Sequence, residues 1–257
     1  MVLLFLLVNW EISIRKGVSR LKKWFEIKNL TQESADLYFY GDIVGDEWGK
    51  WTDDDTCPKD VVDALKMCEG KTLNIYINSG GGDVFGGIAI YNILKRHNQK
   101  KTVYVDGIAG SIASVIAMVG DEIVIPKNAY MMIHKPWTSA WGANSTELRK
   151  IADTLDTLEE GILNIYETRL TEETEIETVK GLLEEETWLT GDEASKYFKV
   201  TVTDEIKALS SIGDSFKHYQ SIPKDVSLMK DKVGESDEKN EDNTKTKLQI
   251  ELDLLDM

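Results

Sequence analysis

The sequence predicts an α/β protein in which helices cover a largely parallel β-sheet. Between residues 35 and 133, short strand-like runs alternate with helical patterns through short links, as in β-α-β units. The chain has 257 residues, of which 42% are hydrophobic, so it has enough apolar material for a core. Its 45 acidic residues outnumber its 30 basic ones, and a net charge of −15 argues against nucleic-acid binding.

Each element of the alternating region is predicted from its own pattern. Apolar residues three or four positions apart indicate helices, and short apolar or β-branched runs that end at glycine or charged residues indicate strands. The alternation implies that helices cover the sheet. In chain order we predict a strand over 35–40, a helix over 60–68, a strand over 73–77, a helix over 84–95, a strand over 102–105, a short helix over 111–119, and strands over 122–125 and 130–133.

A long helix is predicted to begin at Asn144. The run Asn144-Ser-Thr-Glu147 has the form of a capping box. Apolar residues then follow in steps of three and four, which is a heptad seam and calls for a helical partner. That partner belongs either to this chain or to a neighbouring subunit, and we favour the subunit. The seam consists of Leu148, Ile151, Leu155, Leu158, Ile162 and Ile165.

The two ends of the chain differ in composition from its middle. Residues 1–23 are apolar and then basic, too short for a membrane span and without a cleavage site, so we expect a leader outside the fold. The folded domain is expected over 24–212. Residues 213–257 are polar and are expected to be disordered. No later segment is apolar enough for a membrane, and two cysteines are too few for a disulfide scaffold.

His134 is the candidate general base among three histidines. His97 follows a helix that ends in basic residues, and His218 lies close to the polar tail, so both are expected in solvent. His134 instead follows the apolar strand 130–133, and Pro136 stops that strand two residues later. A strand that delivers one imidazole to its end is a suitable holder for a base. A buried core histidine is the alternative.

Ser111 is the candidate nucleophile. It follows a strand and the glycines Gly107 and Gly110, which are expected to allow a sharp turn into a helix. The turn would present the Ser111 hydroxyl to a cleft, with the backbone N–H of Ile112 beside it. An ordinary helix-capping serine is the alternative. Ser114 is the rival nucleophile, but it lies one turn into the helix among apolar residues.

A glycine-rich loop, Asn78-Ser-Gly-Gly-Gly-Asp83, is a candidate anion-binding element. Its backbone N–H groups lie at the end of a strand, where ligand sites of α/β proteins form. No Lys-Ser or Lys-Thr follows the glycines, so a phosphate loop is disfavoured and an oxyanion hole is favoured. The sequence has no histidine pair or Cys-x-x-Cys suited to zinc, and we expect neither a metal nor a cofactor.

Taken together, these motifs resemble the Clp protease proteolytic subunit, and especially its phage head-maturation (prohead) relatives. In the resemblance Ser111 takes the family's nucleophile position and His134 its base position. The spacing of 23 positions from Ser111 to His134 also favours Ser111 over Ser114. The resembling motifs are Ile77-Asn-Ser-Gly-Gly-Gly82, Gly107-Ile-Ala-Gly-Ser111, Ala117-Met-Val-Gly120 and Met132-Ile-His134-Lys-Pro136.

The third member of a Ser-His-acid triad is assigned by the resemblance to Glu186. The family has Asp two residues before an aromatic residue, and here Glu186 precedes Thr187-Trp188. Glutamate can also accept the imidazole N–H, although its extra methylene must be accommodated. Glu184, Glu185 and Asp192 remain competitors. A second departure follows Ala194, where Tyr197-Phe-Lys-Val-Thr-Val-Thr-Asp204 replaces the family's Gly-apolar-Val-Asp ending.

The resemblance implies a crotonase/ClpP-like β-α-β spiral with a protruding handle helix over about 144–170. It implies an oxyanion hole formed by N–H groups of Gly81 or Gly82 and of Ile112, and cleavage of extended polypeptides. It also implies a homo-oligomeric ring (heptameric or double), an AAA+ unfoldase or phage capsid and scaffold proteins as partners, and a cytoplasmic location, in the host if phage-encoded. The alternatives are a crotonase-fold acyl-CoA hydratase or hydrolase, and a non-catalytic assembly protein.

Overall fold

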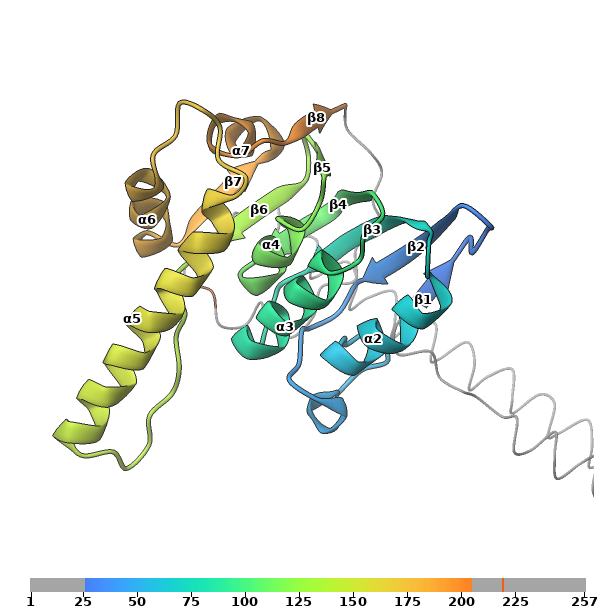
Figure 1. Ribbon diagram of the computed structural model, residues 1–257. Helices are drawn as coiled ribbons and strands as arrows, with labels where there is room; N and C mark the ends of the chain where they lie inside the picture. The colour runs from blue at the N-terminus through green and yellow to red at the C-terminus, as the bar shows by residue number, and fades with distance from the viewer. Residues whose placement is uncertain (1–25, 205–218, 220–257) are drawn as a thin grey trace, which may run out of the picture.

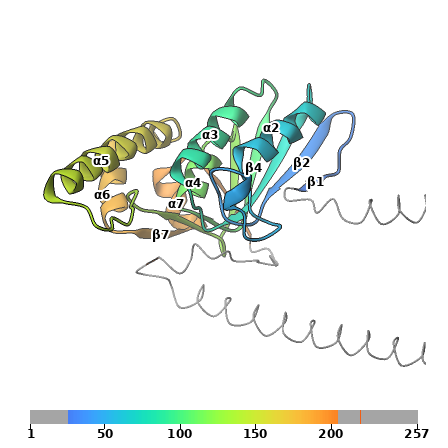
Figure 2. The same ribbon diagram turned by 90° about the horizontal axis from the view of Figure 1, so that it is seen from below.

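The computed structural model describes residues 26–204 and Tyr219. The predicted leader and the rest of the predicted tail lie outside the described residues. Eight strands form one mixed sheet in the order β1-β2-β3-β4-β5-β8, with β6 paired to β4 and β7 paired to β6. Helices α2, α3 and α4 lie over one face of this sheet, and α5 projects away from it (Figures 1 and 2).

The elements follow the predicted order, with small shifts at their ends. Helix α3 has the predicted bounds, and the strands of the alternating region all form. The fold class predicted from the sequence is therefore confirmed. The elements are β1 (Glu26–Lys28), β2 (Ser34–Phe39), the 3-10 helix η1 (Glu47–Gly49), α2 (Pro58–Met67), β3 (Thr72–Ser79), α3 (Val84–Lys95), β4 (Lys101–Gly110), α4 (Ile112–Ala117), β5 (Glu122–Pro126), β6 (Tyr130–Ile133), α5 (Ser145–Glu167), α6 (Ile176–Glu184), β7 (Thr187–Thr190), α7 (Gly191–Tyr197) and β8 (Thr201–Thr203).

Strand β4 is longer than the sequence predicted, because it has a different neighbour along each half of one edge. Residues 102–104 pair with β5, whereas residues 108–110 pair with β6. Both pairings are parallel, and the strand therefore continues through Gly107 and Gly110 instead of turning there. As a result, β4 and β6 end side by side, and the residues that follow them are neighbours.

The two faces of the central strands differ in chemistry. Ile75 and Val103 are buried beneath the helices, as expected for one side of an alternating strand. On the other face, the rings of Tyr38, Tyr76 and Tyr104 stack across β2, β3 and β4, with centroids 4.7 and 5.0 Å apart. These residues are paired in register, so the ladder follows from the parallel alignment of the three strands.

Helix α5 begins as predicted, with Asn144 and Glu147 forming a capping box. Its C-terminal half packs on this chain's own core through Ile162 and Tyr166, which are buried. Leu148, at the other end of the heptad seam, is 49% exposed. Contact with the chain's own domain therefore explains only part of the seam. No helix of residues 26–204, α5 included, combines the length and the apolar character needed to cross a membrane.

Candidate active site

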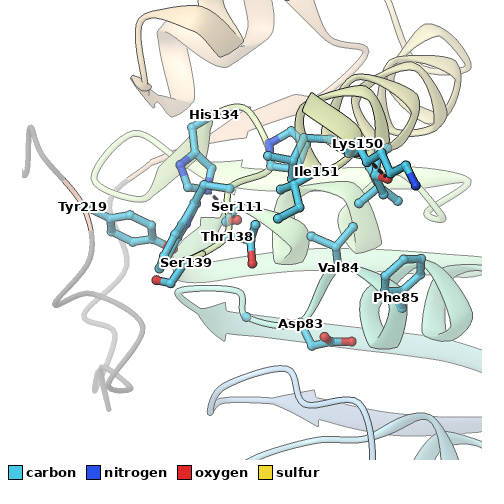
Figure 3. A pocket seen from close by; sticks show the side chains of 16 residues that line it. Asp83, Val84, Phe85, Ser111, His134, Thr138, Ser139, Lys150, Ile151 and Tyr219 are labelled. Carbon is cyan, nitrogen blue, oxygen red and sulfur yellow. Dashed lines mark hydrogen bonds between the residues drawn. The ribbon is translucent and has the colours of Figure 1, made fainter. Parts of the chain in front are cut away.

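Ser111 and His134 lie next to each other at the ends of β4 and β6. The Ser111 N–H donates to the carbonyl oxygen of Met132 at 2.8 Å, which ties the residue after β4 to strand β6. The Ser111 Oγ lies 2.8 Å from the His134 Nε2, a hydrogen-bond distance (Figure 3). Two residues that are 23 positions apart in sequence thus form a hydroxyl–imidazole pair.

The turn at the nucleophile position differs from the sequence-based expectation. Ser111 itself has φ 50° and ψ −126°, whereas neither Gly107 nor Gly110 has a positive φ. A positive φ is uncommon for a residue with a side chain and costs free energy, so the surrounding contacts must hold it. Gly110 serves another purpose, because a Cβ atom there would lie 3.1 Å from the Gly80 carbonyl oxygen. The glycine permits close strand approach, and the serine makes the turn.

Ser114, the rival nucleophile, is fully buried. Its hydroxyl donates to the carbonyl oxygen of Ser111 and lies 2.7 Å from the Tyr166 hydroxyl. Since Ser114 has a single hydroxyl hydrogen, the Tyr166 hydroxyl is the donor in the second bond. Ser114 therefore supports the backbone of Ser111 from behind and is not exposed to the cleft.

The His134 imidazole is suited to accept a proton near neutral pH. Its side chain is 10% exposed, and this burial lowers the pKa of His134, while the nearby Glu186 carboxylate partly offsets the effect. A lowered pKa keeps the ring neutral at neutral pH, and the neutral ring has a lone pair on one nitrogen. The ring of Tyr219 lies edge-on to His134 with centroids 5.5 Å apart.

Glu186 is the acidic residue that the fold places beside His134. Strands β6 and β7 are antiparallel with Ile133 opposite Thr187, so residue 134 and residue 186 face each other just beyond the paired segment. The His134 Nδ1 is 4.0 Å from the Glu186 Oε2, which is an ionic contact longer than a hydrogen bond. Glu186 has φ 48° at the turn between α6 and β7.

The competitors of Glu186 have other positions. The carboxylate of Glu184 pairs with Lys135 at 3.1 Å, and Glu185 is the C-terminal cap of α6. Asp192 lies in the first turn of α7, beyond β7, and is exposed. Among these acidic residues, Glu186 is therefore the one whose contact with the imidazole is found in the structure.

The glycine loop passes directly over the nucleophile. A Cβ atom added to Gly81 would lie 2.8 Å from the Ser111 Cβ and 3.1 Å from the Ile112 nitrogen, so a larger residue would not fit. The Gly81 N–H already donates to the Ser79 hydroxyl at 3.1 Å. This bond leaves Gly82 and Ile112 as the better donors of the predicted oxyanion hole.

Both remaining donors are oriented by their surroundings. Gly82 forms a parallel bridge with Ile43, in which Ile43 bonds to Gly81 and to Asp83. In such a bridge the N–H of the central residue, Gly82, points away from its partner. Ile112 is the first residue of α4, and an N–H in the first turn has no carbonyl partner within its helix.

A cavity of about 630 Å³ opens beside the Ser111–His134 pair. One wall comes from the seam of α5, and the opposite wall from the start of α3, so the cavity is largely apolar (Figure 3). Asp83 and Lys150 supply charged groups to the lining. The other lining residues are Gly82, Val84, Phe85, Pro136, Trp137, Thr138, Ser139, Ile151, Thr154, Leu155, Leu158 and Tyr219.

Sequence reasoning missed several parts of this site. Tyr219 belongs to the predicted polar tail, yet its hydroxyl donates to the Gly80 carbonyl and its ring also contacts Trp188. No local pattern marks such a residue. Leu155 and Leu158 belong to the predicted heptad seam, and in the structure they line the cavity. Within the described part of the chain, no group of histidine, cysteine, aspartate and glutamate side chains could hold a metal ion.

Comparison with known proteins gives one family. A sequence model of the Clp protease family matches residues 53–201, more than half of the chain. Two relatives are described as "ATP-dependent Clp protease proteolytic subunit". The protein of Bacteroides thetaiotaomicron is 28% identical over 131 residues, which are 50% of this chain and 58% of the relative. The protein of Ligilactobacillus salivarius is 40% identical over 86 residues, which are 32% of this chain and 43% of the relative. The chain thus spans about half the length of these curated relatives.

A solved structure supports the fold. A mutant of ClpP1 from Listeria monocytogenes superimposes with a TM-score of 0.54 at 22% identity, covering 66% of this chain and 91% of the other. At this identity the similarity bears on the fold alone.

The His134 environment leads to a first prediction. Because burial lowers the pKa of His134, its titration in the wild-type protein should have a midpoint below that of an exposed histidine. Tyr219→Ala should raise this midpoint, since water would reach the imidazole, whereas Tyr219→Phe keeps the ring and should not. NMR titration of protein labelled at the histidine rings measures both, with His134→Gln used to assign the signal. An unchanged midpoint in Tyr219→Ala would show that this ring does not cover the imidazole.

Proposed function

The chain belongs to the Clp protease family, and we propose that it is a serine-type endopeptidase that cleaves extended polypeptides. The observation that carries the proposal is the 2.8 Å contact between the Ser111 Oγ and the His134 Nε2. A buried, neutral imidazole next to an accessible hydroxyl is the arrangement that makes a serine nucleophilic. The adjoining apolar cavity offers room for a substrate side chain.

In the proposed reaction, the Ser111 Oγ attacks the carbonyl carbon of the scissile peptide bond while the His134 Nε2 takes up the hydroxyl proton. The carbonyl oxygen becomes an oxyanion, which the N–H groups of Gly82 and Ile112 would bind. The C–N bond then breaks, and His134 gives its proton to the leaving amine. Water hydrolyses the resulting ester by the same sequence, with His134 again as the base.

Glu186 is proposed to stabilise the imidazolium that forms during each step. A carboxylate 4.0 Å from the Nδ1 favours the protonated ring by charge attraction. Shortening this contact to a hydrogen bond would also fix the tautomer that leaves the Nε2 facing Ser111. Catalytic hydrogen bonds are often long in a free enzyme and shorten when substrate binds.

The proposed partners follow from the family and from α5. We propose a homo-oligomeric ring with α5 in a subunit contact, since Leu148 is exposed and Ile151 is only half-buried in one chain. An AAA+ unfoldase, or phage capsid and scaffold proteins, are the proposed partners in substrate delivery or processing, with a cytoplasmic location. An acyl-CoA hydratase or a non-catalytic assembly protein would give the Ser111–His134 pair no role.

The nucleophile is tested with a fluorophosphonate probe. Wild-type protein should be labelled at Ser111, Ser111→Ala should not be labelled, and His134→Ala should be labelled several orders of magnitude more slowly, because the base is lost. Intact mass and peptide mapping measure the adduct. Ser195→Ala removes an exposed hydroxyl on α7 and serves as the control with full labelling. Persistent labelling of Ser111→Ala would refute the assignment.

The triad acid is tested by Glu186→Gln, which keeps the size of the side chain and removes its charge. The turnover number for peptide hydrolysis should fall by roughly two to four orders of magnitude, because the imidazolium loses its counter-charge. Glu185→Gln changes the neighbouring carboxylate and should remain close to wild type. Wild-type turnover in Glu186→Gln would transfer the role to another group.

The subunit contact is tested at Leu148, which does not belong to the cavity lining given above. Leu148→Glu should dissociate the assembly, since a charge would then have to be buried in the seam. Thr157→Glu places the same charge about two and a half turns further along α5, on the opposite and exposed side of the helix, and should not. Sedimentation velocity distinguishes the two. If both variants sediment like wild type, this end of the seam is outside the subunit contact.

A further inference from the structure

Glu159 is a buried carboxylate for which the proposed reaction has no use. It lies on α5 with only 5% of its surface exposed, and its Oε1 has no hydrogen-bond partner among the described residues. Its Oε2 lies 3.2 Å from the Nζ of Lys135. Burying a charge costs free energy unless an opposite charge compensates it. The ammonium group of Lys135 supplies that compensating charge for Glu159.

Lys135 connects three elements at the residue that directly follows His134. Its ammonium group contacts Glu159 on α5 and Glu184 at the end of α6, at 3.2 and 3.1 Å. Its backbone N–H donates to the carbonyl oxygen of Leu183 on α6 at 3.1 Å. Lys135 thus attaches the chain beyond β6 to both α5 and α6.

The two ion pairs of the Lys135 ammonium group differ in how much they contribute to stability. The side chain of Glu184 is 57% exposed, and ion pairs in solvent contribute little. The side chain of Glu159 is 7% exposed, so losing its partner would leave a desolvated charge. Of the two ammonium contacts, the one with Glu159 is therefore the one whose loss would cost more, although the Lys135 side chain itself is 40% exposed.

His134 and Glu186 each lie close in sequence to a residue of the Lys135 contacts. His134 immediately precedes Lys135, and Glu186 lies two residues beyond Glu184. The 4.0 Å separation of the His134 Nδ1 and the Glu186 Oε2 consequently depends on how the ends of β6 and α6 are held. A displacement of about 1 Å at a reacting group can reduce a rate by two orders of magnitude.

We propose that Lys135 and Glu159 are positioning residues, whose ion pair holds the end of β6 against α5 and so keeps His134 between Ser111 and Glu186. The inference rests on the proposed peptidase function. It extends that function to α5, which thereby supports the catalytic base as well as lining the cavity. Neither Lys135 nor Glu159 belongs to the described lining of the cavity. Their loss should therefore lower kcat and leave KM nearly unchanged.

The test compares Lys135→Met, Glu159→Gln and the double variant in peptide hydrolysis and fluorophosphonate labelling. Each single change should lower kcat roughly tenfold, and the double variant should be no slower than the slower single variant, because both remove the same pair. Lys135→Arg keeps the charge and should restore most of the rate. Lys127→Met removes a lysine from an exposed pair with Asp204 and should behave as wild type.

Three kinetic results would each overturn the inference: wild-type kcat in both single variants, multiplied losses in the double variant, or a Lys135→Arg variant as slow as Lys135→Met. Thermal unfolding checks that the variants compared are folded. If Lys135→Met does not fold, Glu159→Gln with Lys127→Met as control still decides the question, because the amide is close in size to the carboxylate.

A titration of His134 separates this inference from the proposed function. Among the described residues, Glu186 contacts the imidazole, the Tyr219 ring packs edge-on against it, and Asp83 and Lys150 line the same cavity. Lys135 follows His134 in the chain and pairs with Glu184 and Glu159. Glu159→Gln removes one negative charge and loosens the contact with Glu186. Both changes disfavour the imidazolium, so the NMR-measured pKa of His134 should fall below that of wild type. An unlabelled wild type would refute the peptidase, whereas an unchanged His134 pKa would refute the positioning role.

Discussion

The register of β6 between β4 and β7 is the constraint on which the candidate site depends. Gly110 pairs with Met132 in the parallel direction, and Ile133 pairs with Thr187 in the antiparallel direction. The first pairing brings the residue after β4 next to the imidazole, and the second brings residue 186 opposite residue 134. A slip of one residue would turn the alternating side chains to the other face, so a buried sheet specifies this register strongly.

The same region of the sheet also controls the chemistry of the groups that it brings together. Met131, Met132 and Ile133 are buried, so the imidazole that follows them is largely removed from water, and burial lowers the pKa of His134. The backbone of Ser111 has a positive φ and is held by two hydrogen bonds. Its N–H donates to the Met132 carbonyl oxygen, and its own carbonyl oxygen accepts from the Ser114 hydroxyl. Close packing at the end of the sheet therefore accounts both for the positions of Ser111 and His134 and for the lowered pKa of the imidazole.

Helix α5 contacts both the hydrophobic core and the residues around the Ser111–His134 pair. Its C-terminal half completes the core through Tyr166, whose hydroxyl supports Ser114 and, through it, the backbone of Ser111. Its N-terminal half forms a wall of the cavity. Between these halves, Glu159 reaches the residue next to His134. One helix thus contacts the surroundings of both members of the hydroxyl–imidazole pair, although it contributes neither.

Local sequence patterns are enough to predict the order of strands and helices over residues 35–133, the capped start of α5 and the candidates Ser111 and His134. These features depend on periodicity, capping and strand ends within short segments. The sequence favours Glu186 over Glu184, Glu185 and Asp192 only by resemblance, and it is the pairing of β7 with β6 that brings residue 186 opposite residue 134. The turn predicted at Gly107 and Gly110 lies instead at Ser111, because β4 continues through both glycines by pairing with β6. The contacts of Tyr219 and Glu159 join residues far apart in sequence, and no local pattern records contacts that only folding creates.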